Sequence, residues 1–137
     1  MIPISREDLV VMMEGGHLYL RMGRFEEAKE VFEGVSVLTP QSEVPLVAMG
    51  SVFFAQMKYD QAIRHYRKAV TLKPDSPYAR SFLGESLFFK GRNEEALAEL
   101  QKAIDLDLQG DMGGGFARSL IDAIQKGFDP PGRFVHH

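Results

Sequence analysis

The four histidines are the side chains of this sequence best suited to chemistry, because imidazole is the commonest side-chain metal ligand and a frequent general base. His17 and His65 lie far apart in the sequence and do not form a close-spaced metal pair. His136 and His137 are the last two residues, and we assign them no role. No serine, histidine and aspartate stand in the context of a nucleophile elbow. We therefore expect a protein that is not an enzyme and that binds no metal and no cofactor.

Two other patterns could do chemistry. The segment 110–115, Gly-Asp-Met-Gly-Gly-Gly, precedes a predicted helix, and helix N-termini attract phosphate. It lacks the preceding strand and the Lys-Ser/Thr pair of a nucleotide loop, so we interpret it as a flexible joint. The adjacent acids Glu26 and Glu27 recur as Glu94 and Glu95. This recurrence indicates a structural role in the first turn of a helix, where carboxylates interact well with the helix dipole.

Composition excludes several classes of protein. The 137 residues include 16 basic and 19 acidic side chains, a formal charge of −3, whereas a general nucleic-acid binder carries a basic excess. The absence of cysteine excludes disulfides and thiolate metal sites. The longest apolar run, 46–55, is far short of the roughly 20 residues that span a bilayer. The sequence also has no recognisable export signal. We expect no nucleic-acid partner, no membrane insertion and a cytoplasmic location.

A 34-residue internal repeat dominates the sequence. Gly-Arg-Phe-Glu-Glu-Ala at 23–28 recurs as Met-Lys-Tyr-Asp-Gln-Ala at 57–62 and as Gly-Arg-Asn-Glu-Glu-Ala at 91–96. Each copy of this motif ends in an alanine. A glycine stands twelve residues before that alanine, and a large apolar residue stands four residues after it. The glycines are Gly16, Gly50 and Gly84, and the apolar residues are Phe32, Tyr66 and Leu100.

The repeat predicts helical hairpins. First helices are expected over 9–22, 43–56 and 77–90, and second helices over 25–38, 59–72 and 93–106, from apolar residues at helical spacing. Ser5 is expected to cap the first helix, which then begins near Arg6. The glycines inside the first helices are expected to let the small Ala28, Ala62 and Ala96 approach closely. Asp111 is expected to cap a terminal helix over 111–127, and 128–137 is expected to be a flexible tail.

On these residues the chain resembles the tetratricopeptide repeat (TPR) proteins. Their pattern is met in the first repeat by Met12, Gly15, Gly16, Tyr19, Ala28, Phe32 and Pro40. The second repeat meets it well and the third more weakly, without the aromatics and the final proline. The resemblance implies one all-α domain over 1–127, built of repeats 9–42, 43–76 and 77–110 and the terminal helix. It also implies a right-handed solenoid with a concave groove.

The same resemblance implies which residues face the groove. They are Met13, His17, Leu20, Val47, Ser51, Phe54, Tyr78, Ser81, Glu85, Phe88 and Phe89. The TPR proteins that bind acidic C-terminal tails of heat-shock chaperones use Lys, Asn and Arg to clamp carboxylates. This chain has Met13, Val47 and Ser81 at such positions, so we expect no carboxylate clamp.

An apolar, aromatic groove is rarely left uncovered in a soluble protein, so it implies a partner. We expect a module that binds an extended or helical peptide segment of another protein through apolar anchors. In length and layout the chain is similar to the chaperones of type III secretion translocators, which hold a segment of a hydrophobic client. The alternative is a scaffold or a self-assembling subunit, such as a homodimer. In that case a neighbouring copy or the chain's own tail, through Phe128 and Phe134, fills the groove.

Overall fold

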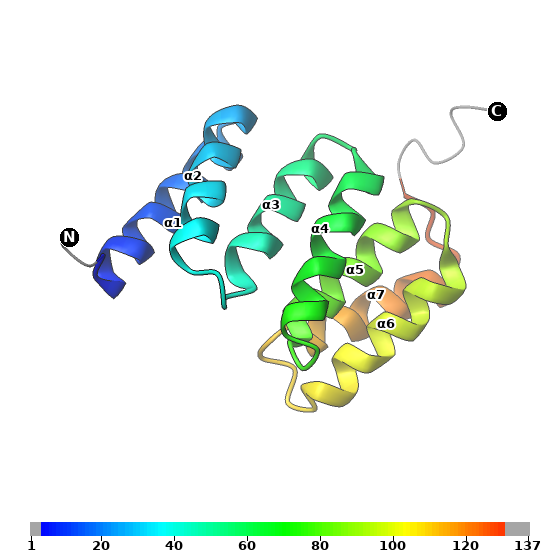
Figure 1. The fold of residues 1–137 in the computed structure, drawn as a ribbon. Helices are drawn as coiled ribbons and strands as arrows, with labels where there is room; N and C mark the ends of the chain where they lie inside the picture. Colours follow the sequence, from blue (N-terminus) through cyan, green and yellow to red (C-terminus); the bar gives the residue numbers. More distant parts are fainter. Residues whose placement is uncertain (1–3, 131–137) are drawn as a thin grey trace.

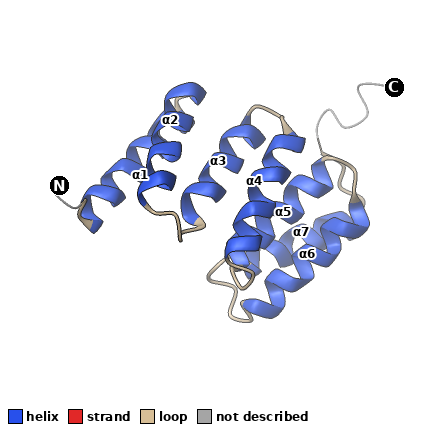
Figure 2. Cartoon of the chain, in the orientation of Figure 1, coloured by secondary structure: helices blue, strands red, loops and turns tan. Residues whose placement is uncertain are grey.

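Seven helices and no strand are found in residues 4–130, the part of the chain that the computed structural model describes (Figure 2). The helices are α1 (Arg6–Arg21), α2 (Phe25–Leu38), α3 (Val44–Ala55), α4 (Tyr59–Leu72), α5 (Pro77–Phe89), α6 (Asn93–Leu106) and α7 (Gly114–Gln125).

The helices stack as hairpins along one direction. The pairs α1–α2, α3–α4 and α5–α6 lie side by side, and α7 packs against α5 and α6 (Figure 1). The first helices also contact one another in order, α1 with α3 and α3 with α5. They therefore form one continuous face. The predicted all-α solenoid of three hairpins and a terminal helix is confirmed.

Helix boundaries follow from caps and turns. The second helices have the predicted bounds, and the first helices differ by at most a few residues. The Ser5 side chain accepts a hydrogen bond from the Asp8 N–H at 3.1 Å, as expected of an N-cap. In the turns within the first and third hairpins, Gly23 and Gly91 have φ of +75° and +90°. Met57 takes this place in the second hairpin at φ +60°, a conformation that L-residues rarely adopt.

The glycines inside the first helices allow each hairpin to close. A Cβ on Gly50 would lie 2.5 Å from the Tyr66 ring, and one on Gly84 would lie 2.6 Å from Leu100. A Cβ on Gly16 would collide with Phe32 in the same way. The sequence predicts the buried alanines as the opposing surface, but the nearest side chains are instead the large residues four positions later.

The terminal helix begins later than predicted. It starts at Gly114 with Gly113 as N-cap, so the prediction that Asp111 caps it is wrong. Asp107 holds this region instead, because its carboxylate accepts hydrogen bonds from the backbone N–H groups of Gly110, Met112 and Gly114. The segment expected to be a flexible joint is thus anchored at three points. These hydrogen bonds, chiefly that from Gly114, lower the pKa of Asp107.

Two apolar clusters form the core. One is centred on α1–α3 and includes Phe32, Met49 and Val52. The other runs from α3 to α7 and includes Tyr66 and Leu100. Within residues 4–130, no helix combines the length and the apolar character that crossing a bilayer requires.

Candidate functional site: the concave pocket

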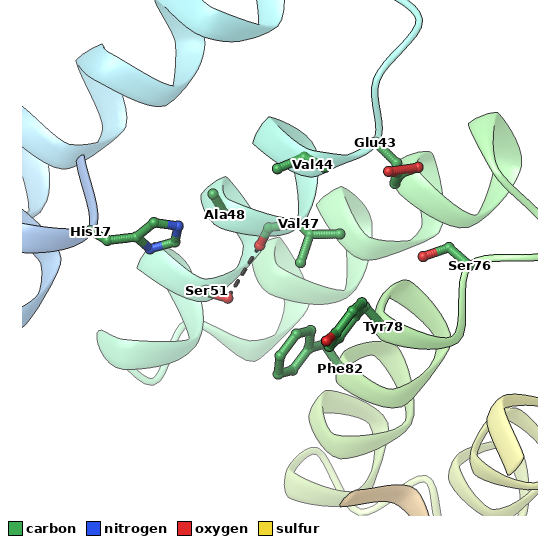
Figure 3. Close-up of a pocket in the computed structure, with 9 residues that line it drawn as sticks. All are labelled: His17, Glu43, Val44, Val47, Ala48, Ser51, Ser76, Tyr78 and Phe82. Atoms are coloured by element: carbon green, nitrogen blue, oxygen red, sulfur yellow. Dashed lines mark hydrogen bonds between the residues drawn. The ribbon is translucent and has the colours of Figure 1, made fainter. Parts of the chain in front are cut away.

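A pocket of about 400 Å³ opens on the face formed by the first helices. Figure 3 shows side chains from α1, α3 and α5 converging on it. We refer to it as the concave pocket. The nine residues that line it are His17, Glu43, Val44, Val47, Ala48, Ser51, Ser76, Tyr78 and Phe82.

Helical spacing explains why α3 and α5 present these residues together. Val44, Val47 and Ser51 are three and four residues apart, and therefore share one face of α3. Tyr78 and Phe82 stand four apart on α5. The start of α5 is fixed by Pro77 in its first turn and by the Ser76 side chain, which accepts from the Ala79 N–H at 3.2 Å. The walls are mostly aliphatic and aromatic carbon.

The floor of the concave pocket is held by a short hydrogen-bond chain. The Ser51 hydroxyl donates to the Val47 carbonyl at 3.2 Å (Figure 3). Because the Ser51 hydroxyl has one proton and donates it to Val47, the Ser51 oxygen accepts a second hydrogen bond from the Tyr66 hydroxyl, at 2.9 Å. Burial raises the pKa of Tyr66, which stays protonated and donates. The Tyr66 ring also stacks on Phe82, with centroids 5.9 Å apart. The floor is thus fixed before any ligand arrives.

The α1 wall carries no charge near neutral pH. The His17 ring lies 5.0 Å from the ring of Phe32, centroid to centroid. Burial, followed by the positive charge of Arg21, lowers the pKa of His17 below its usual value of 6.5. The imidazole is therefore neutral. Glu43, at the opposite edge of the concave pocket, contributes a carboxylate (Figure 3).

Beyond the concave pocket, Glu85 stands on the C-terminal half of α5, one turn before Phe89. Phe89 forms an aromatic cluster with Phe54 of α3 and Tyr59 of α4, and the ring centroids are between 4.9 and 5.6 Å apart. Glu85 is half-buried, and burial raises its pKa to about 7. Burial, followed by the negative charge of Glu85, raises the pKa of Tyr59.

The residues predicted to face the groove are distributed over several environments. His17, Val47, Ser51 and Tyr78 line the concave pocket. Met13 lines a neighbouring hollow of about 430 Å³ between α1 and the start of α3, which His17 also borders. The remaining half-buried residues pack against the core clusters or lie beside them: Leu20, Phe54, Phe89 and Glu85.

The prediction that Ser81 and Phe88 face the groove is wrong. Ser81 and Phe88 are each only 1% exposed, so neither can contact a partner from outside. The Ser81 hydroxyl donates to the Gly113 carbonyl at 2.9 Å, because the segment before α7 folds back over α5. Phe88 is packed in the second core cluster, with Phe128 6.0 Å away, centroid to centroid.

One aromatic residue of the concave pocket was not predicted from the sequence. Phe82 is not among the residues predicted to face the groove, yet it lines the concave pocket, and its spacing of four from Tyr78 could have indicated this. Phe128, the first residue of the predicted tail, lies against Phe88 and not in the concave pocket. The other tail residue expected to fill the groove, Phe134, lies outside the described residues.

Family models identify the repeat. Two models described as tetratricopeptide repeat match residues 13–38 and 47–110, together more than half of the chain. The chain belongs to the tetratricopeptide repeat family. The longer match includes the third TPR, although that repeat lacks the aromatic residues of the pattern. No curated protein matches the chain in sequence.

Solved TPR structures share the fold at low identity. A structure of the type III secretion translocator chaperone SycD from Yersinia enterocolitica, described as an alternative dimer, is 23% identical to this chain with a TM-score of 0.76. The match covers 93% of this chain and 100% of the SycD chain. PcrH in complex with the chaperone binding region of PopB is 15% identical to this chain with a TM-score of 0.74, and the match covers 88% of this chain and 99% of PcrH. The first TPR of Spaghetti (RPAP3), bound to an HSP90 peptide, is 22% identical with a TM-score of 0.71, covering 91% and 99%.

Proposed function

We propose that this TPR protein is a non-enzymatic binding module whose concave face takes an extended or helical segment of another protein. The observation that carries the proposal is the concave pocket, whose walls are mostly apolar and whose floor is already fixed. A preformed site reduces the ordering cost of binding, and apolar anchors of the partner gain about 25 cal/mol per Å² of area removed from water. The proposed contacts are His17, Val47, Ser51 and Tyr78, extended by Met13 along α1.

The proposal includes a chaperone role for a client with an apolar segment. Its support is the shared fold with SycD and PcrH, together with the apolar walls of the concave pocket. A segment seated there is shielded from water and cannot aggregate through the covered side chains. We do not extend the acidic-tail binding of some TPR proteins to this chain, because Val44, Val47 and Phe82 line the concave pocket where a clamp needs cations.

Peptide selection followed by substitution tests the proposal. A random twelve-residue display library is panned against the wild-type protein, and an enriched peptide is synthesised and titrated by calorimetry. Val44 lines the concave pocket and is 50% exposed, so Val44→Glu places a charge there with little effect on folding. We expect it to weaken binding at least about tenfold, because an apolar anchor would have to desolvate the carboxylate.

The matched control is Val37→Glu on α2, where the side chain is 80% exposed and lies outside the concave pocket. This variant should bind with wild-type affinity. A library that yields no enriched sequence, or an enriched peptide that binds both variants equally, would contradict the proposed function.

A second candidate, a homodimer, is favoured by the edge of the solenoid at α1. Val11 and Leu18 are 63% and 50% exposed there, whereas their equivalents in the second repeat, Pro45 and Val52, are buried. The dimer described for SycD supports a second copy as the cover. We propose self-association through this edge, which leaves the concave pocket open for a client.

A further inference from the structure

Glu85 has an unusual place on the concave face. His17, Ser51 and Glu85 each follow the glycine of a first helix, and therefore hold the same register in α1, α3 and α5. The first two line the concave pocket, as does Phe82, which lies one turn before Glu85 on α5. Phe89, one turn after it, belongs to the aromatic cluster. The Glu85 carboxyl is thus set into an aromatic part of the face that the proposed partner covers.

Among residues 4–130, no cation forms an ion pair with this carboxyl. Glu99, by contrast, is 15% exposed and pairs with Arg80 at 2.8 Å. Lys90, the residue that follows α5, pairs with Asp60 at 3.1 Å. Half-buried carboxylates are costly unless they are paired, and so a positive charge from outside would stabilise the ionised form of Glu85.

Within residues 4–130, the titratable groups whose pKa values respond to the Glu85 charge are Tyr59 and Tyr66, two phenols on α4. Their pKa values are raised chiefly by burial and further by that charge. The α3 sequence contains no titratable residue, and burial alone accounts for the raised pKa of Glu85, so no charged group on α6 or α7 contributes. Near pH 7 the carboxyl is poised between its two forms. A cation placed beside it would favour the ionised form.

We propose that the segment bound on the concave face carries a lysine or arginine whose side chain pairs with Glu85. The inference rests on the proposed function, since it names a chemical feature of the same partner. Charge complementarity supports it: the concave pocket itself contributes the Glu43 carboxylate and a neutral His17. The neighbouring rings add to the fit, because Tyr and Phe faces attract cations. The partner therefore combines apolar anchors with a basic residue at a fixed offset.

The experiment compares peptide selection by four proteins. The twelve-residue library is panned against the wild type, Glu85→Gln, Glu43→Gln and Glu30→Gln. Glu43→Gln removes the competing carboxylate at the edge of the concave pocket, and Glu30→Gln changes an exposed glutamate on α2 outside the pocket and serves as the matched control. Circular dichroism confirms that each variant is folded. We expect the wild type and Glu30→Gln to enrich apolar anchors with lysine or arginine at one offset. Glu85→Gln should enrich the same anchors without the basic residue.

A synthetic peptide from the wild-type selection then measures the pairing. Replacing its basic residue by glutamine should weaken binding to the wild type about tenfold and should hardly affect binding to Glu85→Gln, the coupling expected of a charge-assisted pair. Binding of the basic peptide to the wild type should weaken roughly tenfold between pH 7.5 and pH 5.5, because protonation of a group with a pKa of about 7 removes the charge.

The outcomes separate this inference from the proposed function. Enrichment of apolar anchors with no basic preference overturns the pairing and leaves peptide binding intact. A basic preference that disappears in Glu43→Gln and persists in Glu85→Gln also overturns it, since the cation then lies at the edge of the concave pocket. A library that yields no enriched sequence with any of the four proteins removes both the inference and the proposed function.

Discussion

The Glu85 carboxyl links binding chemistry to stability at the scale of one residue. Its pKa rises from 4.5 to about 7 on folding, and so between these values the folded protein holds a proton that the unfolded chain has released. The contribution of Glu85 to the free energy of unfolding therefore decreases as the pH rises from about 4.5 to about 7, and it is largest below that window. This is the opposite of the behaviour of a salt-bridged carboxylate.

Glu85→Gln should stabilise the unliganded protein because glutamine has no charge to desolvate. We expect a gain on the order of 1–2 kcal/mol at pH 8, which allows for solvent screening of a half-buried group, and less than half of that at pH 5. Urea denaturation at the two pH values measures the gain. Glu30→Gln, which changes an exposed glutamate on α2, should alter stability little at either pH. An equal gain for Glu85→Gln at pH 5 and pH 8 would mean that packing, and not ionisation, is responsible.

Individual groove positions could be predicted only as far as the repeat is regular. His17, Val47, Ser51 and Tyr78 reach the concave pocket because α1, α3 and α5 present one face to the same side. Ser81 occupies the register of Val47 but is buried, because the segment that holds Gly113 covers the third hairpin. Phe88 is buried where its counterpart Phe54 is only half-buried. A 34-residue period defines register, whereas exposure depends on what packs next.

At the scale of the helices, two adjacent glycines in α1 have opposite roles. Gly16 faces Phe32, and an added Cβ would collide with that ring. A Cβ added to Gly15 would point into open space, with no atom within 4 Å apart from the neighbouring residues and backbone of its own helix. The first is required for helix packing, whereas the second only increases the flexibility of the unfolded chain and weakens the helix.

The pair Gly16→Ala and Gly15→Ala tests this distinction. We expect Gly16→Ala to destabilise the protein by about 2–3 kcal/mol, since α1 and α2 must separate or Phe32 must leave its rotamer. Gly15→Ala should stabilise it by about 0.5–1 kcal/mol through helix propensity. Thermal unfolding followed by circular dichroism measures both. Changes of the same sign in the two variants would show that the hairpin does not pack as described.

Helix limits were well predicted wherever local chemistry determines them. Each second helix begins two residues after a residue with positive φ (Gly23, Met57 or Gly91) and ends where the apolar period stops. The bounds of all three are those predicted from the sequence. The start of α7 could not be predicted from its neighbours, because it depends on the Asp107 carboxylate bonded to Gly110, Met112 and Gly114. In sequence Asp107 is an ordinary polar residue at the end of a helix. Its role arises only when the following loop folds back on it.

At the scale of the whole molecule, the two ends of the solenoid differ. At one end α7 covers α5 and α6, in the place that the first helix of another repeat would take (Figure 1). At the other end, α1 exposes Val11 and Leu18, which are 63% and 50% exposed, and Met22 just after it is 57% exposed. In the third repeat the equivalents of the first two are Ala79 and Ser86, both fully buried.

The proposed self-association through this edge is based on the repeat equivalence, because side chains at positions buried in α3 and α5 are exposed on α1. We expect the wild type to sediment as a monomer–dimer equilibrium whose apparent mass increases with concentration. Leu18→Glu should raise the dissociation constant at least about tenfold, since dimerisation would bury a charge among apolar side chains. Its helix content should remain that of the wild type, because Leu18 is half-exposed in the monomer.

Val37→Glu on α2 provides the matched control for this measurement. The equivalents of Val37 in the other repeats, Thr71 and Asp105, are exposed and polar, so this position belongs to the solvent-facing surface. Val37→Glu should therefore dimerise like the wild type. Because Leu18 does not line the concave pocket, Leu18→Glu should also retain the affinity for the selected peptide while losing the dimer. A wild-type protein that stays monomeric at every concentration, or a dimer that persists in Leu18→Glu, would exclude the α1 edge as the interface.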